Sequence, residues 1–421
     1  MEYDLVRWWG ICSSRSAHLR QWLEIRLSSI RDVRFRLLRS TTRKPTSGAG
    51  DVLSGQMAIW RNAAYSDIIC DMRQRSSNFE ILRIVAMLMI VAGHFVSQGV
   101  LAGSSMANEG LALMLGSCSR MAVNIFLLIG AWFMVDAAFR PERILDLYLQ
   151  VVFYTIPLTA VMLLLGCAGG ARNVIQGFLP FLGRPVWFVC AYMSLIALTP
   201  FLNRVFTWND AVLRKLVLLL GLLFAVVGSI PSFTPFEYLA DFSWFVVVYL
   251  AVGAGKKATL FDRLPGKWTS LLLGVMLIAL LAVGRIFPAT AFLVNYWGDH
   301  LQSLPNILAA LFVFNFFRLL DIGTVRAVNF AARSTLAVYI IHQTPAFRDF
   351  EWNVVFRAKD VAHLSSPLFV VAVIGVAAGT FVGAAVVDNL YWKRLAPRIS
   401  ESRFYGCIIR ALKRFYAETM P

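Results

Sequence analysis

Apolar runs separated by short polar connections make up most of the chain from residue 79 onward. Each run is about 20 residues long, which is the length that a helix needs to cross the hydrocarbon core of a bilayer. The pattern predicts an all-α polytopic membrane protein with about ten transmembrane helices, of which the sixth and the ninth are short. The expected spans are 80–101, 112–136, 145–168, 185–203, 213–231, 241–256, 268–287, 303–320, 334–347 and 367–390.

The first 71 residues follow a different pattern. They are rich in arginine with scattered aromatic residues, and they lead into a linker of glycine, serine and proline. No transmembrane span fits there, and the uninterrupted apolar core of a secretory signal is missing. We interpret residues 1–71 as a basic extension that is disordered, lies at the membrane interface, or is not needed by the working protein, for which Met72 would be a natural start.

The predicted organisation therefore has three parts. The basic extension covers residues 1–71, a transmembrane domain covers 72–395, and a basic tail covers 396–421. Lysine and arginine are concentrated on one predicted face, whereas the opposite connections hold Arg172, Arg184, Arg348, Arg357 and Lys359, with Arg120 and Arg285 near the boundary. Because positive residues resist translocation, we expect both termini to lie in the cytoplasm.

Composition supports the membrane prediction. The chain is 58% hydrophobic and 15% charged, with a mean hydropathy of +0.65, which is far above the range of a soluble domain. A net charge of +16 favours cytoplasmic loops beside anionic lipid over a nucleic-acid partner. Six cysteines without CxxC spacing suggest neither a disulfide framework nor a zinc site, and we expect no metal and no bound cofactor.

Four polar residues share one face of the first predicted helix. Arg83 and His94 are eleven residues apart, which is three turns plus about 20° and about 16 Å along the axis. Glu80 precedes Arg83 by one turn and Gln98 follows His94 by one turn. A buried arginine is costly in hydrocarbon, so this stripe is expected to face protein or water and to mark a substrate path or a reaction site.

The two ends of the stripe suit different tasks. Arg83, at the predicted inner boundary, can hold a phosphate or carboxylate that arrives from the cytoplasm. His94, deeper in the bilayer, can take a proton from a hydroxyl. The alternative is that Arg83 extends to the lipid headgroups while His94 bonds to a neighbouring helix.

Several segments together resemble a known family. The segment "SSNFEILRIVAMLMIVAGHF" (76–95) contains an arginine and a histidine separated by ten residues, which is the pattern that opens the integral-membrane acyltransferase family called acyltransferase type three. The segments "VNIFLLIGAWFM" (123–134), "RPER" (140–143), "VWFVCAYMSLIALTPFLN" (186–203) and "STLAVYIIHQTP" (334–345) resemble later parts of that family in the expected order. One departure is Gly130-Ala131, where many relatives carry Ser-Gly in the second helix.

The resemblance implies a bacterial enzyme of the inner membrane that moves an acyl group, commonly acetyl from acetyl-CoA, to a hydroxyl of an envelope glycan. On this basis His94 is expected to act as a general base, or less simply as an acyl carrier, and Arg83 to orient the donor. Arg140 and Arg143 would bind the donor at the cytoplasmic mouth, unless they only anchor the topology.

Three further residues are candidates for the same cavity. His342 is expected at a depth close to that of His94, with a helix-to-helix hydrogen bond as the alternative. Trp187 and Tyr192 can stack on sugar or adenine, although aromatic residues at helix ends are more often part of interfacial belts. A transporter or flippase for an anionic glycan or lipid, and an inactive scaffold with the same fold, remain rival hypotheses.

Overall fold

The computed structural model describes residues 77–99, 104–183, 185–230, 241–284 and 288–417. The prediction for residues 1–71 lies outside these ranges. Within them the regular secondary structure is helical throughout. The α-helices are α4 (Asn78–Gln98), α5 (Met106–Met134), α6 (Glu142–Leu164), α7 (Ala171–Phe178), α8 (Trp187–Leu202), α9 (Asp210–Leu220), α10 (Asp241–Lys257), α11 (Lys267–Gly284), α12 (Pro288–Asp299), α13 (Leu304–Arg318), α14 (Arg326–Ala332), α15 (Thr335–Gln343), α16 (Pro345–Phe350), α17 (Ala358–Ala362), α18 (Ser366–Leu390), α19 (Trp392–Ser400) and α20 (Arg403–Phe415).

Six helical segments of the described chain are long and apolar enough to cross a membrane, against the ten spans that the sequence predicts. They are Asn78–Gln98, Met106–Met134, Glu142–Leu164, Trp187–Thr207, Asp210–Ser229 and Ser366–Leu390. A seventh span results if Ala289–Asp299 and Leu304–Arg318, which meet at 57°, are counted together.

The other predicted spans give helices that differ widely in their described length. The run at 241–256 forms α10, which has 17 residues, and the run at 334–347 forms α15, which has only 9. Pro345 explains the second case, because proline lacks the N–H that would continue α15. The count of ten and the cytoplasmic position of the termini remain predictions.

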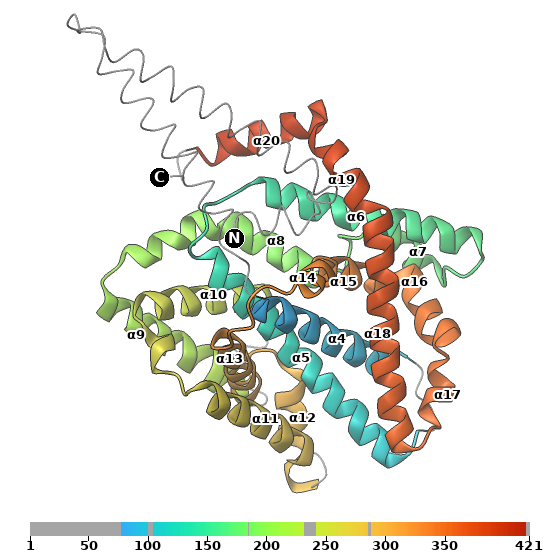
Figure 1. Cartoon of the computed structure of the whole chain (residues 1–421), viewed down its shortest axis with the longest axis horizontal. Helices are drawn as coiled ribbons and strands as arrows, with labels where there is room; N and C mark the ends of the chain where they lie inside the picture. Colours follow the sequence, from blue (N-terminus) through green and yellow to red (C-terminus); the bar gives the residue numbers. More distant parts are fainter. Residues whose placement is uncertain (1–76, 100–103, 184, 231–240, 285–287, 418–421) are drawn as a thin grey trace, which may run out of the picture. The chain divides into compact units, whose positions relative to one another are not determined.

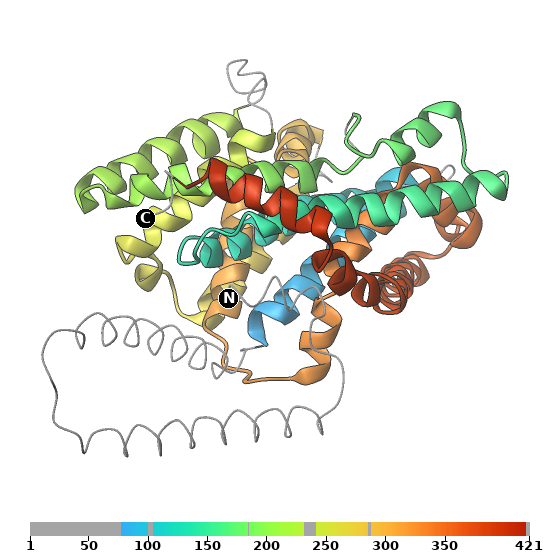
Figure 2. The ribbon, with the colours of Figure 1, turned by 90° about the horizontal axis from the view of Figure 1, so that it is seen from above.

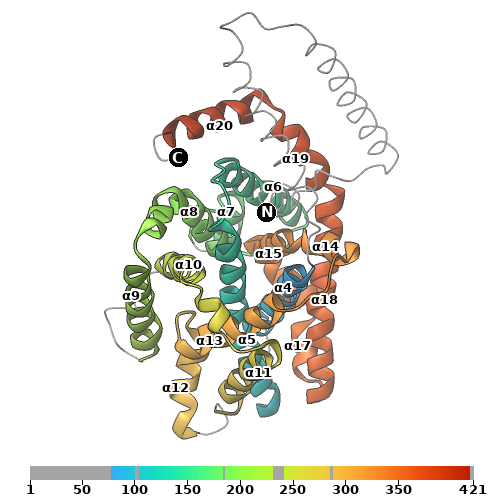
Figure 3. The same cartoon turned by 60° about the vertical axis from the view of Figure 1, so that its left-hand side comes forward.

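Helices α4 and α5 pack along each other and have neighbours on several sides. Figure 1 shows this pair between α18 on one side and α10 and α13 on the other. In the turned view of Figure 3, α9 and α18 lie on opposite sides of this central pair. Helix α15 contacts α4, α6 and α18, so its short length does not leave it exposed to lipid. Helix α4, which carries the polar stripe, therefore lies in the interior of the bundle.

The close approach of α4 and α5 depends on one glycine. A Cβ built on Gly93 would lie 2.3 Å from the Cβ of Ser119, so any larger residue would push the two helices apart. Small residues at helix contacts serve this purpose in membrane proteins. Since His94 follows directly, this contact also determines where the imidazole lies.

A buried polar network fastens the start of α15. The Asp388 carboxylate accepts hydrogen bonds from Tyr154 Oη at 2.6 Å and from Ser334 Oγ at 2.7 Å. It also forms an ion pair with Lys393 Nζ at 2.9 Å, and the two side chains are only 1% and 9% exposed. The network joins α6, α18, α19 and the residue that precedes α15, so it holds the segment that leads to His342.

A second buried carboxyl group lies beyond α16. Glu351 is 5% exposed, and its Oε1 accepts a hydrogen bond from Thr380 Oγ1 at 2.9 Å. Its Oε2 has no hydrogen-bond partner within the part of the chain that the structure describes. Burial raises the pKa of Glu351 to about 7, because the charged form is poorly solvated there.

The basic carboxyl-terminal helix is attached to the bundle by side-chain contacts. Tyr405 Oη donates a hydrogen bond to Asp146 of α6 at 2.7 Å, and Tyr416 Oη donates to the Ala197 carbonyl of α8 at 3.1 Å. Figure 2 shows α20 lying across these two helices. Burial beside the Asp146 carboxylate raises the pKa of Tyr405, which stays a neutral donor.

The Asp388 network yields a stability prediction. Asp388→Asn should lower the free energy of unfolding by about 3 kcal/mol, because it leaves the buried Lys393 ammonium without its anion. The control is Asp360→Asn, which breaks an exposed ion pair with Arg357 and should cost less than about 1 kcal/mol. Thermal unfolding in detergent measures both. Equal melting temperatures for the two variants would contradict the role of the network.

Glu351 yields a prediction about pH. Its pKa is raised in the folded protein, so the unfolded chain releases the proton first and stability falls as pH rises from about 4.5 to about 7. Glu351→Gln should abolish this part of the pH dependence and raise the melting temperature at pH 8. The measurement is the melting temperature of both proteins in one detergent from pH 5 to pH 8. A constant difference between them over this range would show that Glu351 does not titrate there.

Candidate active site

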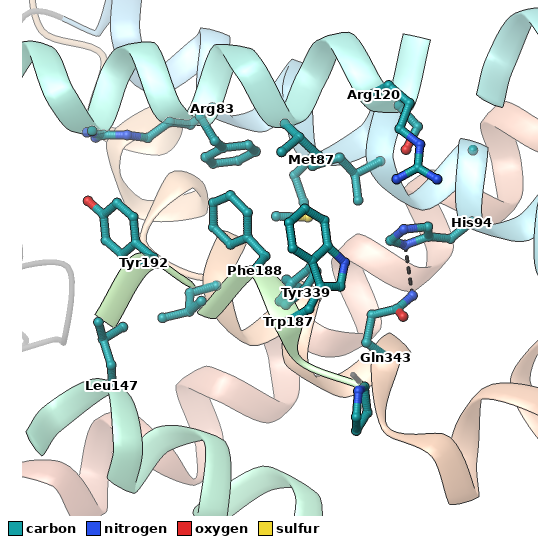
Figure 4. Close-up of a pocket in the computed structure, with 18 of the residues that line it drawn as sticks. Arg83, Met87, His94, Arg120, Leu147, Trp187, Phe188, Tyr192, Tyr339 and Gln343 are labelled. Atoms are coloured by element: carbon teal, nitrogen blue, oxygen red, sulfur yellow. Dashed lines mark hydrogen bonds between the residues drawn. The ribbon is translucent and has the colours of Figure 1, made fainter. Parts of the chain in front are cut away.

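Arg83 and His94 line the same internal cavity, which has a volume of about 620 Å³. The walls come mainly from α4, α5, α6, α7, α8, α15 and α16. Figure 4 shows Arg83 and His94 on one side of this cavity, with Met87 between them. The polar face of α4 is thus directed into an enclosed space and away from lipid.

One end of the cavity is cationic. Arg83 and Arg143 both line it, and both act electrostatically on the Tyr192 hydroxyl. Arg83 Nη1 donates a hydrogen bond to Glu80 Oε1 at 2.6 Å, and the guanidinium lies 5.9 Å from the ring centre of Phe133. These contacts orient the Arg83 guanidinium at this end of the cavity.

Aromatic side chains line the middle of the cavity. Phe188 stacks on Tyr192 with their ring centres 6.0 Å apart and lies 5.7 Å from Tyr339. Trp187 lies 6.1 Å from Phe188 and closer to His94, as Figure 4 shows. A long, largely apolar chain fits between these rings, and a planar or sugar ring can stack on them.

Hydrogen bonds determine which nitrogen of His94 carries the proton. His342 Nδ1 lies 2.6 Å from the Val338 carbonyl oxygen, so this nitrogen carries a proton and donates it to the backbone. In a neutral His342 the other nitrogen, Nε2, must then accept. Nε2 lies 2.8 Å from His94 Nδ1, which is therefore the donor. The remaining nitrogen of His94, Nε2, is left with a free lone pair.

Gln343 holds the His94 ring from a second direction. Its side-chain amide lies 2.8 Å from the same Nδ1. The amide nitrogen, Gln343 Nε2, also donates to Gln98 Oε1 at 3.3 Å, so the Gln343 oxygen accepts the His94 Nδ1 proton only when the amides of Gln343 and Gln98 turn together. His94 is thereby oriented by two residues, and its Nε2 is the basic atom of the site.

The other predicted residues have different positions. Gln98 and Trp187 line the cavity, whereas Glu80 acts behind Arg83. His342 is fully buried behind His94 and reaches the cavity only through it. Arg140, expected beside Arg143 as a donor-binding residue, is not part of the cavity wall.

Gly130, where the family resemblance leads us to expect a serine, lies against the Tyr192 phenol. Gly130 lines the cavity, and a Cβ built on it would lie 3.0 Å from the Tyr192 hydroxyl oxygen. The phenol of Tyr192 therefore occupies the space that a serine side chain would need. A hydroxyl group is still present at this point of the wall.

Sequence reasoning missed part of the wall around His94. Arg120, Arg172, Arg348 and Gln343 all line the cavity. Arg120 lies in the apolar run of α5, and its position there could have identified it as a candidate functional residue. Arg172 and Arg348 belong to short helices whose docking beside α6 no local pattern indicates. Within the described ranges, His, Cys, Asp and Glu form no group of three that could hold a metal ion.

Comparison with known families identifies the fold. The family model described as an acyltransferase domain, of acyltransferase type 3, matches residues 76–388. The chain belongs to this acyltransferase family. The comparisons with curated proteins and with solved structures gave no match.

The part of the chain that matches the acyltransferase type 3 family contains the cavity. The matched residues include the described lining residues of that cavity, from Arg83 to Arg348. A membrane acyltransferase needs a base beside its acceptor, and the oriented His94 is a histidine that lines this space with a free ring nitrogen. The resemblance that the sequence shows to the family is thus confirmed.

The histidine pair yields a prediction for this acyltransferase. His342→Leu should lower the rate constant of transfer about 100-fold. The His94 Nδ1 proton then has no acceptor in residue 342, so the proton is no longer held on that nitrogen. His342→Gln should retain most of the activity, since the amide oxygen can accept the same proton. Single-turnover transfer rates measure the difference. Equal rates for the two variants would mean that His342 serves only for packing.

Proposed function

We propose that this acyltransferase moves an acyl group, most simply acetyl, from CoA at the cytoplasmic side to a hydroxyl of a cell-envelope or exported polysaccharide. The observation that carries the proposal is one cavity with arginines at one end and an oriented histidine toward the other. The proposed reaction needs no bound cofactor, because acyl-CoA is itself a substrate.

The length of the cavity suits the donor. Arg83 and His94 are separated by eleven residues of one helix, which corresponds to about 16 Å. A pantetheine arm is of similar length and is mostly apolar, like the aromatic middle of the wall. Arg83 and Arg143 would then bind phosphates of the nucleotide part, while the thioester lies beside His94.

Arg140 and Glu80 support this end without lining it. Glu80 keeps the Arg83 guanidinium in a fixed orientation through a buried hydrogen bond. Arg140 lies one turn of chain before Arg143, at the predicted cytoplasmic mouth, and would attract the anionic donor before it enters.

The chemistry at the other end is proton transfer coupled to acyl transfer. His94 Nε2 takes the proton of the acceptor hydroxyl as its oxygen attacks the thioester carbonyl carbon. The side-chain amide of Gln98, which lines the cavity near His94, can donate a hydrogen bond to the oxyanion. When the C–S bond breaks, the CoA sulfur leaves as a thiolate and takes the proton from the His94 imidazolium. The products are an ester and free CoA.

The acceptor side fits a sugar. Trp187 and Gln98 line the cavity near His94 and offer a stacking face and a polar side chain. Glycans or glycolipids at the outer face of a bacterial inner membrane would reach His94 from this end, only four residues before α4 ends. Membrane lipids surround the bundle, and nucleic acid has no place in this proposal.

His94→Ala in the native bacterium tests the proposed function. Surface glycan should lose its ester-linked acyl groups by about 100-fold or more, because the general base is gone. The amount of exported glycan should stay normal. The matched control is His363→Ala, which removes an exposed histidine outside the cavity and should leave esterification unchanged. Mass analysis of the isolated glycan measures both quantities.

Two results would contradict the proposal. Normal ester content in His94→Ala would remove the role of His94. Loss of glycan export in that variant, with esters intact on the glycan that remains, would favour a transporter or flippase. Purified protein in detergent gives an independent readout, because transfer to an added glycan releases free CoA.

A further inference from the structure

The cavity holds a second group of arginines, at the His94 end. Arg120 comes from α5, Arg172 from α7 and Arg348 from α16, and all three line the cavity. Asn173 and Gln176 add polar groups to the same part of the wall. Three separate elements thus bring positive charge to the space that the acceptor must enter.

The distance of this arginine group from the reacting atoms is short. Arg120 and Arg348 both act electrostatically on the His94 imidazole. Figure 4 shows the Arg120 guanidinium directed toward His94 from the neighbouring helix α5. A ligand group held by Arg120 and Arg348 would therefore lie near His94. The hydrogen bond from Asn173 Nδ2 to Asp349 Oδ2, at 3.4 Å, places α7, which carries Arg172, beside α16.

The positive charge of these three arginines is only partly neutralised by acidic residues in the part of the chain that the structure describes. Among the described residues, neither Arg120 nor Arg172 forms an ion pair. Arg348 contacts only the adjacent Asp349 carboxylate through Nε, at 3.4 Å. Asp299 is the one acidic residue among the described residues of the wall, against three arginines at this end. The local excess of guanidinium groups favours an anionic ligand.

A neutral acceptor would not need this arrangement. Hydroxyl groups of a sugar are served by amides and carboxylates, which Asn173, Gln176 and Asp299 already provide. Guanidinium groups suit carboxylate and phosphate oxygens, which they bind through paired hydrogen bonds. The donor phosphates have a separate cationic site, Arg83 and Arg143, beyond the aromatic middle of the cavity.

We propose that Arg120, Arg172 and Arg348 bind a carboxylate or phosphate group of the acceptor and so select an anionic acceptor for acylation at His94. The inference rests on the proposed acyl transfer and adds the substrate class. The anionic group belongs either to the glycan itself, as a uronic acid or phosphate substituent, or to the diphosphate of a lipid carrier. Both present the same oxyanion chemistry.

The experiment compares matched acceptors with the full chain in nanodiscs and acetyl-CoA as donor. One acceptor is a neutral oligosaccharide, the second is its C6-oxidised uronic acid form, and the third is the neutral oligosaccharide on a polyprenyl diphosphate. Acyl transfer is followed as CoA release and as ester formation. The wild-type protein should have a KM at least about tenfold lower for one of the anionic acceptors than for the neutral one.

Variants show whether the arginines cause this preference. Arg120→Gln and Arg172→Gln should each raise the KM of the anionic acceptor about tenfold or more and leave the KM of acetyl-CoA unchanged. Arg120→Lys keeps the charge and should retain part of the preference. The control Lys359→Gln removes an exposed positive charge outside the cavity and should have no effect. An unchanged donor KM also shows that a variant is folded.

The acceptors separate the two sources of the anion. Preference for the uronic acid form assigns the charge to the glycan, and preference for the diphosphate form assigns it to the carrier. Equal KM values for all three acceptors, unaffected by the glutamine variants, would overturn the inference while the acyl transfer stands. Absence of transfer by the wild-type protein to any acceptor would overturn the proposed function and the inference with it.

Discussion

The cost of placing charge and imidazole in hydrocarbon controls how this protein is built. Arg83 and His94 stand on one face of an otherwise apolar helix, so that face has to be covered by protein or water. Helices α5, α13, α15 and α18 meet this demand by packing around α4. The interior space that results is the cavity to which we assign the proposed reaction. The need to keep Arg83 and His94 away from hydrocarbon therefore accounts both for the packing around α4 and for the location of the candidate site.

In the proposed reaction, donor binding at Arg83 and proton transfer at His94 take place at different positions along α4. The arginines at one end and the histidine at the other are joined by a passage with aromatic walls. A donor with a long flexible arm can keep its charged part at one end while its reactive carbon lies beside His94. In the proposed reaction, a soluble donor and an acceptor from the opposite side of the bilayer would meet without either crossing it completely.

The orientation of His94 depends on buried groups that no ligand touches. His342 holds the Nδ1 proton of His94, and the Val338 carbonyl in turn holds His342. Helix α15, which carries His342, has only 9 residues and is too short to position itself. The network around Asp388 holds Ser334, the residue before this helix. The helix ends at Gln343, two residues before Pro345. Groups that contact a base from behind, without touching the substrate, commonly decide whether the base has the correct tautomer.

The sequence alone determined the helical membrane character, the polar stripe on the first helix and the family. These features depend on hydropathy and on spacing within a single helix, where 3.6 residues per turn relates position to direction. Only the tertiary structure decided that Arg143 lines the cavity and Arg140 does not, that His342 lies behind His94, and that arginines from α5, α7 and α16 line the same cavity. It also showed that the run at 334–347 breaks into two short helices. Contacts between helices depend on how far each one is displaced and rotated against its neighbours, and no periodicity within one segment records that information.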